Sequence, residues 1–211
     1  GHLYAKQWGL PAIEAYLVTR YHLYNQVYFH KVNMLTQVYV IRALKRAREL
    51  VDSGEMKVSR RMERMLTDSE LSVKDYLALT DSLVQAELSA FSTHPDPVLS
   101  KWAGMLESRS GMHKRVRVRD LTEVAFWGAM NNVKEILSAA GFDPEEDMIV
   151  TRVSKEGYRP YSEGIRLEDG RDIADVSPLV ASIAAPQNDI MLFVPEECRA
   201  AAEEAIQSAM P

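Results

Sequence analysis

The chain has 211 residues, of which 46% are hydrophobic and 26% charged, with a formal net charge of −5. This composition is typical of a globular protein and excludes collagen-like, disordered and disulfide-framework classes. The single cysteine, Cys198, has no partner within the chain, so a reducing cytoplasm is the expected compartment. No apolar run reaches the ~18 residues of a membrane helix, and the N-terminus lacks a signal-peptide layout, so no membrane association is expected.

The first part of the sequence is predicted to be helical. From residue 11 to about 51 apolar residues recur at helical spacing without a glycine or a further proline. This pattern predicts one very long helix, or two in near-continuation, ended by Asp52-Ser53-Gly54. Further helices are predicted over 59–66, 72–91 and 97–108. A turn at 93–97 separates the last two, because each of its prolines pushes the preceding residue out of the helical region.

The pattern changes after Gly111, where basic and apolar residues alternate with the period of a strand over 114–119. The segments predicted beyond it are strands over 148–153, 161–167 and 190–194 and helices over 122–140, 177–184 and 195–209. The predicted fold class is therefore α+β, with a mainly α-helical portion over 1–110 and a smaller α+β lobe over 111–211.

Several kinds of catalytic motif are missing. The five histidines are scattered, and no His-Asp pair, His-Glu-x-x-His helix or Cys-x-x-Cys occurs, so we expect no metal site within this chain. The glycines never fall in the spacing of a P-loop or a dinucleotide turn, and no Gly-x-Ser-x-Gly elbow is present.

A polar ridge is predicted inside the long helix. On an uninterrupted helix Arg20, Tyr24, Tyr28 and Lys31 share one broad face, with Arg20 and Lys31 only ~20° apart in angle. Residues 1–65 carry 11 basic and 5 acidic side chains, a balance of +6, which indicates either an anionic ligand or partner near these helices or a solvated helix face. Cations separated by phenol rings would bind a nucleotide. The alternative is that the tyrosines are core aromatics with cations at the core's edge.

These residues also carry a resemblance to a known family. The stretch Arg20-x-x-x-Tyr24-x-x-x-Tyr28-Phe29-His30-Lys31 resembles the helix downstream of the catalytic core in HD-domain phosphohydrolases of the deoxynucleotide triphosphohydrolase type. The segment from Tyr76 to Asp81, Tyr-Leu-Ala-Leu-Thr-Asp, is similar to a later stretch of that family. The resemblance covers nearly the whole chain and is strongest over residues 12–120.

The resemblance implies that the chain is the C-terminal part of a longer enzyme. In that family the metal ligands, a His, a His-Asp pair and a later Asp, lie upstream of this helix, and Gly1-His2 resembles an expression scar. The implied partners are the missing N-terminal HD core, further copies in a homo-oligomer, and nucleoside triphosphates. A divalent metal of the Mn, Mg, Fe or Ni class is implied for the full-length protein, with none bound by this chain.

The family's functional residues carry over position by position. Arg20 would bind substrate phosphate, Tyr28 would stack on the sugar, and Tyr24 would contribute a hydroxyl hydrogen bond; no catalytic residue is implied within the chain. The residues implied for a regulatory nucleotide at a subunit interface are His30, Lys31 and Lys114.

The leading interpretation is therefore a C-terminal fragment of a metal-dependent HD-type nucleoside triphosphate phosphohydrolase, inactive when isolated. Its implied products are nucleoside and tripolyphosphate. The alternative is a non-catalytic nucleotide-binding or oligomerisation module. A nucleic-acid-binding module is disfavoured by the sequence pI near 5.6, the balance of −11 over residues 66–211 and the lack of a docking motif.

Overall fold

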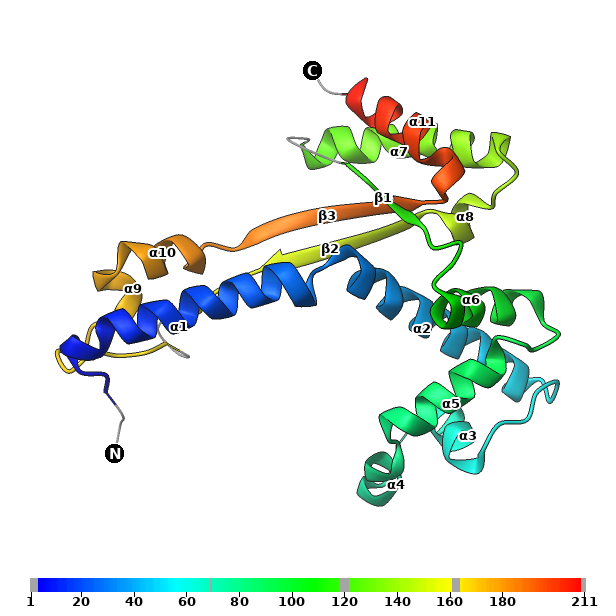
Figure 1. Cartoon of the computed structure of the whole chain (residues 1–211), viewed down its shortest axis with the longest axis horizontal. Coiled ribbons are helices and arrows are strands. Elements are labelled where there is room, and N and C mark those ends of the chain that lie inside the picture. Colours follow the sequence, from blue (N-terminus) through cyan, green and yellow to red (C-terminus); the bar gives the residue numbers. More distant parts are fainter. Residues whose placement is uncertain (1–3, 69, 118–121, 161–163, 210–211) are drawn as a thin grey trace. The chain divides into compact units, whose positions relative to one another are not determined.

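The computed structural model describes residues 4–68, 70–117, 122–160 and 164–209 (Figure 1). Within them the helices are α1 Leu10–Leu23, α2 Lys31–Asp52, α3 Arg60–Thr67, α4 Val73–Ala78, α5 Asp81–Phe91, α6 Pro97–Ser108, α7 Glu123–Ala139, α8 Pro144–Asp147, α9 Ile173–Val176, α10 Pro178–Ala184 and α11 Glu196–Gln207. Single turns of other helix types are η1 Gln7–Gly9 and η2 Tyr24–Tyr28, and the strands are β1 Lys114–Val116, β2 Ile149–Lys155 and β3 Gln187–Val194. The fold class is α+β, as the sequence predicted.

The chain forms two compact units. The first comprises Gly1–Asn33 and Lys114–Pro211, and the second comprises Met34–His113. The return to the first unit, between residues 113 and 114, lies close to the predicted boundary at 110. The first 33 residues, however, group with the C-terminal part and not with the following helices, because α1 packs on α9 and α10.

The first unit contains a three-stranded antiparallel sheet of order β1-β3-β2. Lys114 pairs with Val194 on one side of β3, and Ile149 pairs with Phe193 on the other. Helices α7 and α11 pack on one face of this sheet (Figure 1). The core between them consists of Val116, Phe126, Ala129, Met130, Val133, Leu137, Leu192, Val194, Cys198, Ala202 and Ile206.

A second core of this unit forms beneath α1. Leu17 of α1 packs with Tyr158, Ile173, Val180 and Ile183, which come from the loop after β2 and from α9 and α10. A hydrogen bond of 2.5 Å from the Ser177 hydroxyl to the Glu14 carboxylate joins the same elements. This contact fixes α1 beside α10 and so positions the side chains that follow Leu17 on α1.

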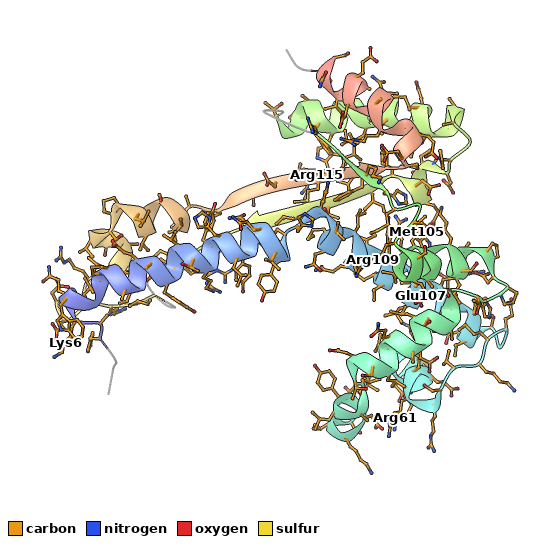
Figure 2. All side chains as sticks on the ribbon, viewed as in Figure 1. Lys6, Arg61, Met105, Glu107, Arg109 and Arg115 are labelled. Carbon is orange, nitrogen blue, oxygen red and sulfur yellow. The ribbon has the colours of Figure 1, made fainter. Side chains whose placement is uncertain are left out.

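The second unit is organised around α2. Its Tyr39 is fully buried, and the Tyr39 ring lies 5.6 Å from the ring of Trp102 in α6. The Tyr39 hydroxyl accepts the amide proton of His113 at 2.9 Å and lies 2.8 Å from its Nδ1 atom. Helix α6 ends at Ser108, and the residue after it, Arg109, is labelled in Figure 2. Arg109 has a left-handed φ of 53°. An aromatic core therefore ties the two ends of this unit together.

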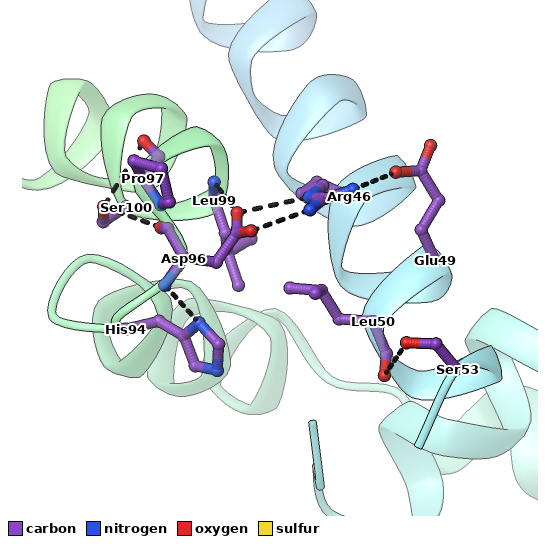
Figure 3. Close-up of polar contacts among 9 residues, drawn as sticks. All are labelled: Arg46, Glu49, Leu50, Ser53, His94, Asp96, Pro97, Leu99 and Ser100. Atoms are coloured by element: carbon purple, nitrogen blue, oxygen red, sulfur yellow. Dashed lines mark hydrogen bonds and ion pairs between the residues drawn. The ribbon is translucent and has the colours of Figure 1, made fainter. Parts of the chain in front are cut away.

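An ion pair connects α2 with the start of α6 (Figure 3). Arg46 makes two hydrogen bonds to the Asp96 carboxylate, at 3.2 and 2.8 Å, and a third to Glu49 at 2.7 Å. Asp96 also caps α6 by accepting the amide proton of Leu99 at 2.8 Å. Its backbone N–H donates to Nδ1 of His94, which orders the predicted turn.

Most predicted elements are present. The long helical stretch is two helices in near-continuation, α1 and α2 with η2 between them, which is one of the two predicted forms. The segment predicted as one helix over 72–91 is two, because Thr80 caps a new helix by accepting the amide proton of Leu83. In the segment predicted as a strand over 161–167, Arg166 and Leu167 form isolated bridges, since their neighbours turn back at Gly170. Residues 161–163 and 118–119 of the predicted strands lie outside the described residues.

None of the described helices is both long and apolar enough to span a membrane.

The Arg46–Asp96 pair generates a pH prediction for the second unit. The pKa of Asp96 is lowered to about 2, chiefly by its hydrogen bonds with Arg46, and its side chain is only 13% exposed. A carboxylate with a depressed pKa stabilises the fold above its unfolded pKa near 3.8, and this contribution is lost as the pH falls toward 2. We expect Asp96→Asn to lower the free energy of unfolding by about 2 kcal/mol at pH 6, with the difference from wild type shrinking between pH 4 and pH 2. Urea unfolding of both proteins across this pH range measures the difference in their free energies of unfolding. A difference that stays the same from pH 6 to pH 2 would contradict the prediction.

Candidate functional site

A pocket of about 480 Å³ opens in the first unit between α1 and the loop that follows β2. We call it the α1 pocket. One wall comes from α1 and the residues just after it, and the other comes from the end of β2, residues 156–159 (the Gly157 loop) and Ile165. Its lining residues are Leu17, Arg20, Tyr21, Tyr24, Asn25, Phe29, Ser154, Glu156, Gly157, Tyr158, Arg159 and Ile165.

Arg20 provides positive charge on the helical wall. Its Nη1 atom lies 3.5 Å from the Gly157 carbonyl oxygen, at the limit of a hydrogen bond, and its guanidinium carbon lies 4.9 Å from the centre of the Tyr24 ring. The side chain is solvent-exposed. Neither contact neutralises the guanidinium, so Arg20 can bind an anion while the Tyr24 ring and the Gly157 carbonyl hold its orientation.

A turn of π-helix follows α1 and shapes this wall. The amide of Phe29 donates to the carbonyl of Tyr24 at 2.8 Å, five residues back, and Phe29 then leaves the helical conformation. Such turns insert one extra residue and occur often at functional sites. The rings of Tyr24 and Tyr28 lie 4.8 Å apart, and Asn33 closes the break by donating to the Tyr28 carbonyl at 3.0 Å. The turn therefore brings two tyrosines together beside Arg20.

The Gly157 loop is fixed by buried hydrogen bonds. The Gly157 amide donates to the Ile183 carbonyl at 2.9 Å. The hydroxyl of Tyr158, a residue that is 95% buried, donates to the Asp172 carboxylate at 2.9 Å and accepts the amide proton of Ile165 at 2.5 Å. Burial raises the pKa of Tyr158 to about 12, so the phenol stays protonated at neutral pH and anchors the loop.

The structure brings together part of the predicted ridge. Arg20 and Tyr24 line the α1 pocket, and the Tyr28 ring contacts that of Tyr24 in a tilted arrangement without lining the pocket itself. Lys31 is the first residue of α2 and is exposed. Its predicted angle to Arg20 assumed an uninterrupted helix and does not apply, because the π-turn and the break at Phe29 reset the helical phase.

The residues predicted for a regulatory nucleotide lie in different places. His30 is exposed in the break between α1 and α2, where its Nδ1 accepts the amide proton of Val32 at 3.4 Å. Lys114 lies on β1 and forms an ion pair of 3.2 Å with Glu196. The described contacts do not join Lys114 to His30 or Lys31, so their shared role stays a prediction.

The pocket residues that follow β2 were not predicted from the sequence. Glu156, Gly157 and Arg159 follow β2 and lie more than 130 positions after Arg20. The helical spacing that singled out Arg20 contains no information about them, since only the tertiary packing of α1 brings the loop near. The local signal in the sequence is a glycine shortly after the predicted strand 148–153, which marks a turn or a close backbone approach.

Among the described residues no three His, Cys, Asp or Glu side chains lie close enough together to hold a metal ion. The pocket contributes a single carboxylate, Glu156, and that group is already paired with Arg159 at 2.7 Å. The described side chains therefore do not fit a catalytic divalent metal, which needs several oxygen or nitrogen ligands.

The pocket's chemistry is that of a site for an anionic ligand with an aromatic or sugar portion. Arg20 and Arg159 supply positive charge from opposite walls, while Tyr21, Tyr24 and Phe29 supply ring surface. Arginine binds phosphate oxygens in a bidentate manner, and aromatic rings pack against bases or sugars.

The sequence was compared with protein families and with a bacterial relative, YwfO. No protein-family model matches the chain. The chain is 26% identical, over 205 residues, to the uncharacterized protein YwfO of Bacillus subtilis; the match covers 91% of this chain and 46% of YwfO.

Solved structures show the fold. A phosphohydrolase from Bacteroides thetaiotaomicron matches 92% of this chain and 52% of its own with a TM-score of 0.70 at 22% sequence identity. A hypothetical protein from Aquifex aeolicus matches 96% of this chain and 47% of its own with a TM-score of 0.63, also at 22% identity. The chain thus has a phosphohydrolase-like fold and spans about half the length of the proteins it matches.

The close packing at Gly157 generates a stability prediction. A β carbon there would lie 2.9 Å from the Tyr21 ring and 3.0 Å from the Ile183 carbonyl oxygen. We expect Gly157→Ala to lower the free energy of unfolding by about 1–3 kcal/mol through overpacking. Gly128→Ala, in α7 with nothing within 4 Å, is the matched control in the same unit and should be neutral or stabilising by up to about 1 kcal/mol. Denaturant unfolding of both variants decides, and equal stability of the two would refute the packing argument.

Proposed function

We propose that this chain is the substrate-pocket half of a longer, metal-dependent phosphohydrolase that cleaves a nucleoside triphosphate, deoxynucleotides included, to nucleoside and tripolyphosphate. The observation that carries the proposal is the α1 pocket, in which an exposed guanidinium and adjacent tyrosine rings face a loop that supplies a second arginine. A fold shared with a phosphohydrolase about twice as long supports it.

The pocket side chains have distinct proposed roles. Arg20 binds phosphate oxygens through its guanidinium, which stabilises negative charge on the phosphate chain. The Tyr24 hydroxyl donates a hydrogen bond to the ligand. The Tyr28 ring, which lies 4.8 Å from the Tyr24 ring and outside the pocket lining, packs against the part of the sugar that extends beyond the pocket. Tyr158 is buried, and with a pKa of about 12 its phenol stays protonated at neutral pH. It therefore cannot accept a proton as a base, and its role is to hold the loop.

The metal is proposed to belong to the other half of the longer protein, since the described residues here do not assemble a site for it. A divalent ion of the Mn, Mg, Fe or Ni class would supply the activated hydroxide that attacks the phosphate. This chain's residues bind and orient the triphosphate. The isolated chain should accordingly show no metal-dependent turnover.

The outer side of α1 carries exposed apolar residues, which support the proposal that a partner covers it. Its inner side packs on α9 and α10, yet large apolar residues also lie exposed along the rest of α1 and its flanking turns. These exposed residues are Trp8, Tyr16, Leu23 and Val27. Large apolar residues that gather on an exposed surface mark an interaction site, so the proposed other half of the protein, the HD core, packs here.

His30, Lys31 and Lys114 are proposed to bind a regulatory nucleotide between subunits of a homo-oligomer.

The test is hydrolysis by the full-length gene product that contains this chain. With a divalent metal it should release tripolyphosphate from a deoxynucleoside triphosphate. Arg20→Ala should lower kcat/KM about 10- to 100-fold, because a charge-assisted contact to phosphate is lost. Arg48→Ala is the control: Arg48 is exposed on α2 and paired with Asp52, outside the pocket, so its loss should leave kcat/KM unchanged.

Two results would count against the proposal. Unaltered hydrolysis in Arg20→Ala would remove the pocket from the reaction. Nucleotide binding without any metal-dependent hydrolysis by the full-length protein would support the non-catalytic binding module instead.

A further inference from the structure

The Gly157 loop offers a feature that the proposed roles do not use. Glu156 and Arg159 both line the α1 pocket and form an ion pair, Nε to Oε2, of 2.7 Å. The Glu156 side chain is 25% exposed and that of Arg159 is 67% exposed. The pair thus lies at the mouth of the pocket, on the wall opposite Arg20.

The backbone that carries this pair is held in place. Between the two residues, the Gly157 amide donates a hydrogen bond to the Ile183 carbonyl. The Tyr158 hydroxyl is hydrogen-bonded to the Asp172 carboxylate and to the Ile165 amide. A ligand therefore meets a fixed backbone that carries the exposed side chain of Arg159. Fixing the backbone lowers the entropy that ordering the site would cost.

The ion pair itself is weak enough to be exchanged. Solvent reaches both side chains and screens the attraction between them, so such a pair contributes little to stability. A phosphate group offers arginine two oxygens and more than one negative charge, so it competes well with a single carboxylate. Arg20 lies at the same pocket, and two guanidinium groups bind a polyphosphate chain better than one.

We propose that Arg159 is a second phosphate-binding residue of the α1 pocket, and that Glu156 holds it in competition with the ligand. In the free protein Glu156 pairs with Arg159; in the complex Arg159 turns to the phosphate chain and Glu156 loses its partner. Glu156 therefore weakens binding, and it does so more for ligands with more phosphate charge. This inference rests on the proposed function, because it places the phosphate chain of the same ligand.

The test uses the 211-residue chain and two probes, inorganic tripolyphosphate and dGTP, with affinity measured by isothermal titration calorimetry. Arg159→Ala should weaken binding of both about tenfold, as expected for loss of one charge-assisted hydrogen bond. Glu156→Gln should tighten tripolyphosphate binding about three- to tenfold, because a competing and repelling charge is removed. A purely structural pair would give the same direction of change for both variants.

The chain offers a matched control pair. Arg171 and Asp169 form an exposed ion pair of the same length, 2.7 Å, and neither lines the pocket. Arg171→Ala and Asp169→Asn should leave both affinities unchanged. These controls account for the general effect of changing the net charge by one unit.

The outcomes separate this inference from the proposed function. Opposite changes for Arg159→Ala and Glu156→Gln, with silent controls, support it. If Arg20→Ala abolishes binding while the Arg159 and Glu156 variants behave as the controls do, the inference is overturned and the proposed function stands. If the wild-type chain binds neither probe, both are overturned.

Discussion

Gly157 lies where α1, α10 and the loop after β2 meet, and the three elements come so close there that a β carbon would lie 3.0 Å or less from its neighbours. Its amide donates a hydrogen bond to the carbonyl of Ile183 in α10, and its carbonyl oxygen faces Arg20 of α1. Arg20 and Arg159 share one pocket because of this approach. The constraint is steric, so any larger residue would separate the two walls that the ligand is proposed to bridge.

The π-turn acts on the other end of the pocket. By adding one residue to the turn, it brings the Tyr28 ring to 4.8 Å from the Tyr24 ring and then ends the helix at Phe29. Phe29 consequently reaches the pocket, whereas Lys31 starts a new helix with a different phase. The arrangement gives α1 a rigid segment for packing, where Leu17 is buried, and an irregular segment that presents rings and charge.

Sequence reasoning succeeded where the determining interactions are local. The positions where α3 and α6 begin are set by the N-capping side chains of Ser59 and Asp96, which can be read directly from the sequence. Arg20 and Tyr24 were found because they lie one helical turn apart. The rest depends on interactions between distant segments: no residue type marks a π-turn in advance, and Glu156 and Arg159 join the pocket only through the packing of α1 on α10. The grouping of residues 1–33 with the C-terminal part was missed for the same reason.

The most direct measurement is amide hydrogen exchange of the 211-residue chain with and without tripolyphosphate. The central claim is that the residues from Arg20 to Phe29 and the Gly157 loop are two walls of one phosphate site. We expect the ligand to slow exchange in both segments together and to leave α11, on the far side of the sheet core, unchanged. Slowed exchange in only one of the two segments, or in neither, would contradict the claim that they form one site.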